Sequence, residues 1–405
     1  MALIVQKYGG TSVANIERIQ NVAKRVARTF DQGNDVVVIL SAMSGVTDKL
    51  IGMAQEISKR PDRRELDVLL ATGEQTTSAL LAMTLISMNY PAQSLMGFQA
   101  EVRTDCAYGN ARINEVGARW IKDLVENRKI VVVAGFQGMD PGGNITTLGR
   151  GGSDTSAVAI AAAINADVCE IYTDVDGVYT TDPNICAKAR KMSKITYDEM
   201  LEMASLGAKV LQIRSVEFAK KFNVPVHVRS SFSEEEGTMV VNEYTDMERL
   251  VVSGITCSKN DARIVIKGVP DQPGVAAKVL TPIADAGIVV DMIIQSAPKN
   301  GTNDIAFTVP KIDLDRALEI EEKVAKELGA KEVHGDKGIA KVSVVGVGMK
   351  NHAGVAVKMF STLAAENINI RMISTSEIHI SCVITEKYAE LAVRALHTAF
   401  GLDKE

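Results

Sequence analysis

An ungapped internal repeat in the C-terminal half constrains the fold of this chain most strongly. Residues 268–296, GVPDQPGVAAKVLTPIADAGIVVDMIIQS, align with residues 348–376, GMKNHAGVAVKMFSTLAAENINIRMISTS, with ten identities in 29 positions. Each copy has the pattern strand, glycine turn, helix, strand, strand, helix. The sequence therefore predicts two small βαββαβ modules, over 263–337 and 339–405, that bind something between them, with a duplicated spacer as the alternative.

The second copy lacks a final strand. After its second predicted helix, EKYAELAVRALHTAFGL, only DKE remains. The segment RLVVSGITCS (249–258) precedes the first copy, has no place in it, and has the composition of a strand. Because an unpaired sheet edge favours association, we expect residues 249–258 to complete the second module, so that the first module is inserted within it.

The N-terminal half alternates between strands and helices. The short β-branched runs LIVQK, DVVVIL, KIVVVAGF, VCEIYT and VPVHVR are separated by helical stretches such as NIERIQNVAKRVARTF. Continuous apolar strands between helices are typical of a mostly parallel sheet that is covered on both faces. We therefore expect an α/β domain over 1–230, and a linker over the polar, acidic residues 231–248.

Composition excludes several classes of function. The net charge of -5 does not suggest nucleic acid or a membrane surface as a partner, and no apolar run reaches the roughly 18 residues that span a bilayer. The N-terminus MALIVQKYGG lacks a basic start, so it is read as a strand and not a signal peptide. Five scattered cysteines without a C-x-x-C motif favour a reduced, cytoplasmic protein without structural zinc.

Five loops of the N-terminal half have residues suited to ligand chemistry, and no histidine precedes His227. In the first loop Lys7 ends a strand and Gly9 and Gly10 follow, an arrangement that lets the backbone approach a phosphate. An ordinary strand–helix turn is an equally good reading, because the P-loop and G-x-G-x-x-G patterns are absent. The second and third loops, ILSAMSGVTDKL and LLATGEQTT, contain hydroxyl groups and Glu74, which could also be a first-turn acid of a helix.

The fourth loop, TTLGRGGSDTSA, combines opposite charges at a predicted helix start. Arg150 lies among glycines, and an arginine beside free backbone N–H groups is suited to an anion. Asp154 adds a negative charge at the same place, so the loop suits a ligand that carries both charges. The fifth loop, IYTDVDGVYTTDP, is acidic. A polar hairpin is its alternative reading, and the EF-hand spacing for calcium is absent.

Six segments, KYGGTS, LSAMSGVT, TLGRGGSDTSA, YTDVDGVYTTDP, GAKVLQ and ENINIRMISTSEI, together resemble the signature segments of aspartate kinases, in order and at similar spacings. The resemblance covers nearly the whole chain. It implies a three-layer αβα amino acid kinase domain followed by two ACT modules, which transfers the γ-phosphoryl of MgATP to the β-carboxylate of L-aspartate and gives 4-phospho-L-aspartate.

Two alternative functions are less well supported. A kinase for a related acceptor, such as glutamate or acetylglutamate, would lack the paired ACT tail with STSEI. A catalytically silent amino-acid sensor would have lost Lys7, Arg150 or Asp154, and all three are present. A fused homoserine dehydrogenase domain is not expected either.

The resemblance also implies roles for individual residues, with Lys7, Arg150 and Asp154 as the catalytic set. Arg150 grips the α-carboxylate of aspartate, Asp154 and Glu74 are candidates for its ammonium group, and the β-carboxylate is already ionised and needs no base. Asn184 stands where many relatives have an arginine. Magnesium is implied, without a dedicated protein cage. The implied ATP-binding residues are Lys7, Gly9, Gly10, Thr173, Asp174, Tyr179, Asp182 and Lys209, and the aspartate site adds Ser41, Thr47, Gly151 and Ser153.

Regulation by amino acids is the last implication of the resemblance. The turns PDQPGVA and KNHAGVA present free N–H groups at helix starts, which suit a carboxylate. Lysine, threonine or both are expected to bind between ACT modules of two chains and to inhibit. The chain is expected to form a homodimer, or an α2β2 assembly with a regulatory chain that starts near Met247. The expected effector residues are Asp271, Gly274, Val275 and Ala276, with Gln295 and Asn369 on the second strands.

Overall fold

The structure, a computed structural model, describes residues 1–208, 210–242, 251–352 and 354–404. The chain divides into two compact units. The first unit contains residues 1–178, 191–205 and 209–247, and the second contains residues 179–190, 206–208 and 248–405. The expected positions Lys209 and Met247 lie outside the described residues.

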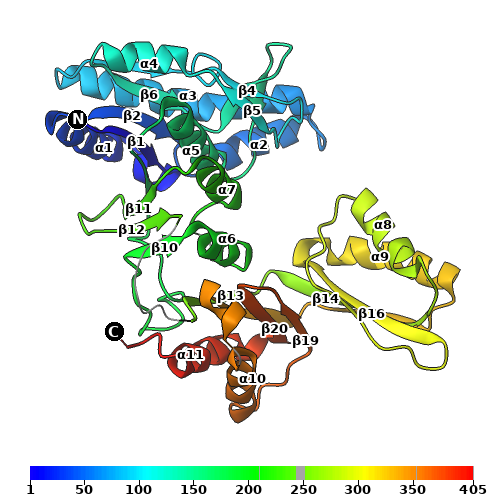
Figure 1. The fold of residues 1–405 in the computed structure, drawn as a ribbon. Helices are drawn as coiled ribbons and strands as arrows, with labels where there is room; N and C mark the ends of the chain where they lie inside the picture. The colour runs from blue at the N-terminus through cyan, green and yellow to red at the C-terminus, as the bar shows by residue number, and fades with distance from the viewer. Residues whose placement is uncertain (209, 243–250, 353, 405) are drawn as a thin grey trace. The chain divides into compact units, whose positions relative to one another are not determined.

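A mostly parallel eight-stranded sheet forms the centre of the first unit (Figure 1). Its strand order is β10-β12-β11-β9-β1-β2-β6-β3, and every neighbouring pair is parallel except β11 and β12. The predicted sheet is therefore confirmed. The strands are β1 (Leu3–Tyr8), β2 (Asp35–Leu40), β3 (Ala92–Leu95), β6 (Ile130–Ala134), β9 (Val168–Thr173), β10 (Lys194–Thr196), β11 (Val226–Ser230) and β12 (Thr238–Val241).

Helices cover both faces of this sheet, because alternate residues of its central strands are buried on opposite sides. Val36 and Val38 of β2 pack in one core with α1 (Ile16–Asp31) and α3 (Arg63–Ser87). Val37 and Ile39 are equally buried, and α4 (Arg119–Glu126) and α5 (Gly152–Ile164) contact the same strand outside that core. The remaining helices of the unit are α2 (Val46–Ile57), α6 (Tyr197–Ser205) and α7 (Ile213–Phe222).

Two features of the first unit were not expected from the sequence. A second, four-stranded sheet has the order β5-β4-β7-β8, with β4 (Val102–Thr104), β5 (Ile113–Val116), β7 (Gln137–Met139) and β8 (Ile145–Thr147). The predicted linker 231–248 contains β12, which pairs with β11 and β10 within the main sheet. Acidic residues precede β12 and hid its short apolar run from the sequence pattern.

The second unit contains two antiparallel four-stranded sheets, one for each copy of the repeat. We call the copies module 1 and module 2. Module 1 has the order β15-β16-β14-β17 and contains β14 (Asp261–Pro270), α8 (Val275–Asp285), β15 (Ile293–Gln295), β16 (Thr302–Pro310), α9 (Leu314–Leu328) and β17 (Glu332–Asp336). Module 2 has the order β13-β18-β20-β19 and contains β13 (Gly254–Ser258), β18 (Ile339–Val345), α10 (Val355–Ala365), β19 (Met372–Thr375), β20 (His379–Thr385) and α11 (Ala389–Ala399).

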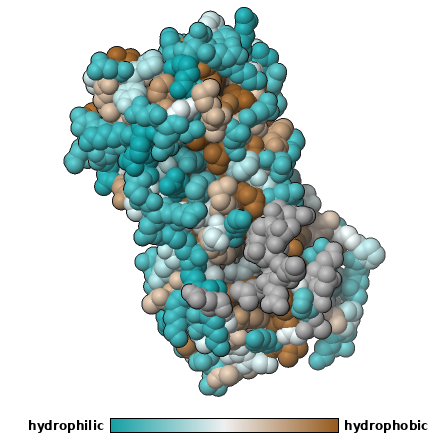
Figure 2. Space-filling view, turned by 60° about the vertical axis from the view of Figure 1, so that its left-hand side comes forward, coloured by the Kyte–Doolittle hydropathy of each residue, from teal (hydrophilic) through white to brown (hydrophobic). Residues whose placement is uncertain are grey.

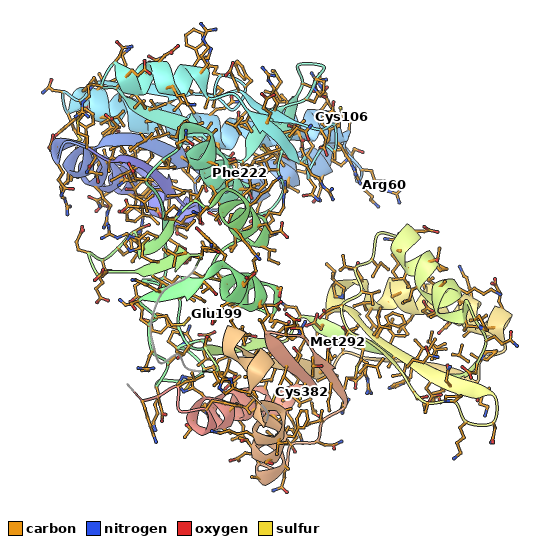
Figure 3. All side chains as sticks on the ribbon, viewed as in Figure 1. Arg60, Cys106, Glu199, Phe222, Met292 and Cys382 are labelled. Carbon is orange, nitrogen blue, oxygen red and sulfur yellow. The ribbon has the colours of Figure 1, made fainter. Side chains whose placement is uncertain are left out.

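The edge strand of module 2 comes from the chain before module 1. β13 pairs antiparallel with β18, with Gly254 opposite Val345 and Ser258 opposite Lys341. Its side chain Ile255 is buried in the core of module 2. The same core contains Cys382 of β20, which Figure 3 labels. The Sγ of Cys382 lies 4.0 Å from the Sδ of Met359 of α10.

Modules 1 and 2 contact each other through an apolar cluster flanked by charges. Met292 of module 1 packs with Ile339, Met372 and Val383 of module 2. Lys341 of β18 forms an ion pair with Asp291 of module 1, and its side chain is 5% exposed. Further ion pairs join Arg371 of module 2 to Asp336, and Lys341 to Asp261 at 3.9 Å.

No helix of the described residues is long and apolar enough to span a membrane. The face in Figure 2 is mostly hydrophilic, with apolar residues in small groups. All five cysteines are free.

Candidate functional site

Three of the expected loops leave the main sheet at one edge. β9, β1 and β2 are neighbours and parallel, so their carboxyl ends lie together, where ligands bind in open α/β sheets. The segments that follow them begin at Gly9, Ser41 and Asp174. The backbone N–H of Gly9 donates to the carbonyl of Tyr172 over 3.3 Å, which ties the first loop to β9.

Lys7 and Asp154 form an ion pair at this edge. The Nζ of Lys7 lies 2.6 Å from Oδ1 of Asp154, and the two side chains are 10% and 13% exposed. Asp154 is in the first turn of α5, so the pair brings the start of α5 to the end of β1. Exclusion of water strengthens such a charge pair. Lys7 is thereby held beside Gly9, where an added Cβ would lie 3.5 Å from its Nζ.

Close backbone packing explains two glycines around the second loop. A Cβ on Gly10 would lie 2.8 Å from the carbonyl oxygen of Ala42, and one on Gly73 would lie 2.7 Å from the Cβ of Ala42. Ser44 donates its backbone N–H to the carbonyl of Gly10 over 3.2 Å. The first and second loops therefore pack directly against each other, and a side chain at Gly10 would separate them. A side chain at Gly73 would push α3 away from the second loop.

Glu74 is a buried carboxylate with one oxygen unused among the described partners. It lies within α3 and is 3% exposed. Its Oε1 accepts the backbone N–H of Ala42 over 2.9 Å, whereas Oε2 has no partner among the described residues. Burial raises the pKa of Glu74 to about 7. A nearby cation would offset that burial cost, which suits a contact with an ammonium group. Ser41 is close to Glu74, because the N–H of the next residue, Ala42, donates to the Glu74 carboxylate. The carbonyl of Ser41 accepts the hydroxyl of Thr77 over 2.9 Å. Thr47 is in the first turn of α2.

The fourth loop exposes Arg150 between two glycines in the left-handed region. Gly149 has φ 79° and Gly151 has φ 72°, and a Cβ on Gly151 would lie 2.5 Å from the Cγ of Gln212. Gln212 also donates to the carbonyl of Arg150 over 2.9 Å. The backbone of the loop is thus fixed while the arginine side chain is exposed, and the buried Ser153 follows it.

The fifth loop is divided between the two units. In the first unit, the hydroxyl of Thr173 donates to Oδ1 of Asp174 over 3.1 Å. In the second unit, Oδ1 of Asp182 accepts the backbone N–H of Asn184 over 2.8 Å and its side-chain amide over 3.1 Å. Tyr179 belongs to the second unit as well. Asn184 therefore holds the exposed Asp182 in a local turn.

Sequence analysis missed a pair of serines at the same sheet edge. The hydroxyl oxygens of Ser12 and Ser231 lie 2.5 Å apart, and Ser231 donates its backbone N–H to the carbonyl of Thr173 over 2.8 Å. The run RSSF (229–232), with two serines at the end of a predicted strand, was the available signal, but Ser231 fell within the predicted linker 231–248.

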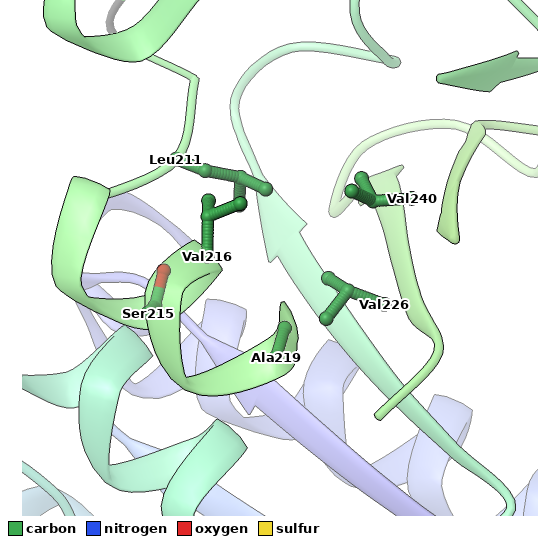
Figure 4. A pocket seen from close by; sticks show the side chains of 6 residues that line it. All are labelled: Leu211, Ser215, Val216, Ala219, Val226 and Val240. Carbon is green, nitrogen blue, oxygen red and sulfur yellow. The ribbon is translucent and has the colours of Figure 1, made fainter. Parts of the chain in front are cut away.

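An apolar gap lies between α7, β11 and β12 (Figure 4). None of the described residues that line it carries a charge, so these residues are suited to packing and not to a phosphate or an amino acid. Its lining residues are Leu211, Ser215, Val216, Ala219, Val226 and Val240.

The expected effector residues lie in separate places of the second unit. Gly274 (φ 87°) is the N-cap of α8, and no side-chain cap forms a hydrogen bond there. The N–H of Val275 donates to the carbonyl of Gln272 over 3.3 Å, and Ala276 follows it in the first turn of the helix. Asp271 precedes it, and its Oδ1 accepts from the amide of Asn303 over 3.1 Å.

One of these placements was wrong. Gln295 does lie on β15, one of the two edge strands of the module 1 sheet. Asn369 lies before β19 and not on a strand, because the chain leaves α10 through Asn367 (φ 56°) and begins to pair with β20 only at Met372.

Comparisons with known proteins identify the family and its domains. Residues 2–230 match the amino acid kinase family, and residues 263–329 and 342–400 each match an ACT domain. The chain is 58% identical over 404 residues to the aspartate kinase Ask_LysC of Stutzerimonas stutzeri, which covers 100% of this chain and 98% of that protein. It is 57% identical over 405 residues to the aspartokinase of Pseudomonas aeruginosa, with the same coverage.

Two solved structures of Escherichia coli aspartokinase III are similar as well, each at 27% identity over 98% of this chain and 99% of that one. The complex with aspartate and ADP (R-state) has a TM-score of 0.81, and the complex with lysine and aspartate (T-state) has a TM-score of 0.78. Together with the full-length relatives, they show that this chain belongs to the aspartate kinase family, with an amino acid kinase domain followed by two ACT domains.

Proposed function

We propose that the sheet edge around Lys7 is where this ATP-dependent aspartate kinase transfers the phosphoryl group. The supporting observation is the ion pair of Lys7 and Asp154 beside Gly9. Lys7 and the backbone of Gly9 and Gly10 bind the transferring phosphoryl group and stabilise the negative charge on its oxygens, as electrostatic catalysis of phosphoryl transfer requires. Asp154 orients the ammonium group of Lys7.

Aspartate binds on the other side of the transferred group. Arg150 pairs with its α-carboxylate, and Glu74 and Asp154 receive its α-ammonium group. The β-carboxylate, ionised at neutral pH, attacks the γ-phosphorus of ATP without a protein base, and ADP leaves. The remaining proposed aspartate contacts are Ser41, Thr47, Gly151 and Ser153.

ATP is proposed to bind through the loop after β9. Thr173, Asp174, Tyr179 and Asp182 surround the nucleotide, and Lys209 reaches its phosphates. Among the described residues no three His, Cys, Asp or Glu side chains gather as a metal site. We propose that Mg²⁺ is held mainly by phosphate oxygens and water, a common mode for this ion, where it would neutralise the developing charge.

Replacing Lys7 with methionine tests the proposed phosphoryl site. We expect Lys7→Met to lower kcat by roughly 10²–10⁴, because one charge on the transferring group is lost, while the circular dichroism spectrum is retained. Lys49→Met, at an exposed position of α2, is the matched control and should keep full activity. Near-normal turnover of Lys7→Met would reject the assignment.

We also propose that the ACT modules bind lysine, threonine or both and inhibit the enzyme, in a homodimer or in an α2β2 assembly that includes a regulatory chain starting near Met247. The lysine complex of the Escherichia coli relative supports lysine. Inhibition requires that the effector bind an inactive state more tightly than the active one. The five free cysteines support a cytoplasmic location.

Two substitutions in module 1 test this regulation. Asp271→Ala and Gln295→Ala should each weaken inhibition by lysine and threonine, added singly and together, without changing the aspartate KM. Asp285→Ala, at the end of α8 and away from the turn, is the control. Unchanged inhibition in both variants would place the effector site elsewhere.

A further inference from the structure

Residues 179–190 lie in the sequence of the kinase domain but pack with the second unit. Their attachment is centred on Thr180, which is 4% exposed. The carbonyl of Thr180 accepts the backbone N–H of Ile255 in β13 over 2.8 Å, and its own N–H donates to the carbonyl of Arg190 over 2.9 Å. The two ends of this loop are thus closed against each other and joined to the edge strand of module 2.

A buried histidine completes the attachment. Nε2 of His397, in α11, lies 2.9 Å from the hydroxyl oxygen of Thr180, and His397 is 0% exposed. The same hydroxyl oxygen accepts the backbone N–H of Arg190 over 3.0 Å. Burial lowers the pKa of His397, so the ring is neutral, and its Nε2 shares one hydrogen bond with the hydroxyl of Thr180, the donor being set by the ring tautomer. Its Nδ1 has no partner among the described residues.

Further contacts hold the rest of the loop on the C-terminal segment. Nε of Arg190 donates to the carbonyl of Leu402 over 2.9 Å. Arg394 of α11 reaches the carbonyl of Ile185 over 3.4 Å. Lys188 lies 3.6 Å from Asp403. These contacts are mostly exposed, whereas the contact of His397 with Thr180 is buried and therefore fixes the geometry of the loop most firmly.

The histidine is specific to module 2. In both modules a three-residue turn joins the last central strand to the second helix, after Pro310 in module 1 and after Thr385 in module 2. In this alignment the position equivalent to His397 is occupied in module 1 by Glu322, which is exposed on α9. The fold of the module does not itself require a buried histidine at this position.

We propose that His397 is a positioning residue of the kinase reaction, which holds Thr180 and thereby fixes the loop with Tyr179 and Asp182 for ATP. The inference rests on the nucleotide roles proposed above for those two residues. A side chain of a regulatory module then sets the affinity for ATP, and a change of module 2 that moves α11 moves this loop directly.

The test compares His397→Ala with His397→Gln, whose side-chain amide can again form a hydrogen bond with the Thr180 hydroxyl. We expect His397→Ala to raise the ATP KM roughly five- to tenfold, as for the loss of one buried hydrogen bond, with kcat and the aspartate KM within about twofold. His397→Gln should restore most of the ATP KM. Leu396→Ala, which removes a core side chain beside it, should lower stability without this selective effect.

Amide hydrogen exchange of residues 181–187 distinguishes a failure of the positioning role of His397 from a failure of the nucleotide roles of Tyr179 and Asp182. His397→Ala should speed exchange there, and His397→Gln should not. Unchanged exchange would overturn the positioning role. Faster exchange with an unchanged ATP KM would overturn the nucleotide roles of Tyr179 and Asp182 and, with them, this inference. An equal change of both KM values and kcat, as from general loosening, would also overturn it.

Discussion

The two copies of the repeat have the same fold but differ where they contact other parts of the chain. Module 1 is formed from one continuous segment and closes its sheet with β17, whereas module 2 takes β13 from upstream. At equivalent repeat positions, Asp291 of module 1 corresponds to Arg371 of module 2. Each pairs with an opposite charge of the other module, Asp291 with Lys341 and Arg371 with Asp336. Opposite charges at this position stabilise contact between unlike modules and disfavour contact between like ones. Met292 and Met372, also equivalent, remain alike in the apolar cluster between them.

A second difference concerns the cores. When the modules are aligned through the turns after Pro310 and Thr385, Glu321 of module 1 is equivalent to Leu396 of module 2, and both are 0% exposed. Neither carboxylate oxygen of Glu321 has a partner among the described residues. Module 2 thus has an apolar core where module 1 includes a carboxyl group, and duplication alone does not preserve core composition.

The largest expected effect comes from removing the borrowed strand's core side chain. Ile255→Ala should destabilise module 2 by about 2–5 kcal/mol through cavity formation, and should speed amide exchange in α11 while leaving α9 protected. Ile264→Ala, in the core of module 1, is the matched variant and should do the reverse. If Ile255→Ala left α11 fully protected, β13 would not be part of the module 2 core.

A smaller, pH-dependent effect is expected from replacing Glu321 of module 1 with leucine, the residue at the equivalent position of module 2. Burial raises the pKa of Glu321 to about 7, so the folded state keeps a proton that the unfolded chain loses near its ordinary pKa. The contribution of Glu321 to the free energy of unfolding is therefore fully present below about pH 4.5 and is lost as the pH rises through about 7. Glu321→Leu should stabilise module 1 by about 2–3 kcal/mol more at pH 8 than at pH 4.5.

Urea unfolding at the two pH values measures this difference. Glu322→Leu, at the exposed neighbouring position, should show no comparable pH dependence. A stability gain of Glu321→Leu that is the same at both pH values would mean that the carboxyl group does not titrate in the core.

The smallest expected effect concerns the contact between the modules. Burial alone would raise the pKa of Asp336, but the hydrogen bond from Gly338 and the charge of Arg371 lower it below its ordinary value. Its ionised form is therefore stabilised by folding, and that stabilisation is lost as the pH falls through its lowered pKa. Arg371→Ala should cost less than about 1 kcal/mol at pH 7, because the pair is partly exposed.

The cost should shrink as the pH falls through the lowered pKa of Asp336, which urea unfolding at about pH 7 and at acidic pH can measure. Arg316→Ala, on an exposed face of α9, is the control. A loss above about 2 kcal/mol would show that the two modules depend on their charged contacts far more than surface pairs usually allow.

Sequence patterns were sufficient for the elements with strong periodicity. β-branched runs such as DVVVIL became central parallel strands, and the repeat became two similar sheets. Local patterns could not place what depends on distant partners. The packing of residues 179–190 with module 2 depends on Thr180 and His397, which are far apart in sequence. Glu321 is buried although glutamate is usually an exposed residue. The strand β12 was hidden by its acidic flank, and the serine pair of Ser12 and Ser231 joins two ends of the first unit.

The insertion of module 1 sets an order of events during synthesis. β13 leaves the ribosome before any residue of module 1, but its partner β18 follows only after module 1 is complete. At roughly 5–20 residues per second, β13 must wait several seconds without a partner. Module 1, once folded, brings the ends of its own segment together and shortens the loop that β13 and β18 must close. We therefore expect the folding of module 1 to speed the pairing of β13 with β18, and a slow-folding variant of module 1 to leave β13 unpaired and open to aggregation for longer.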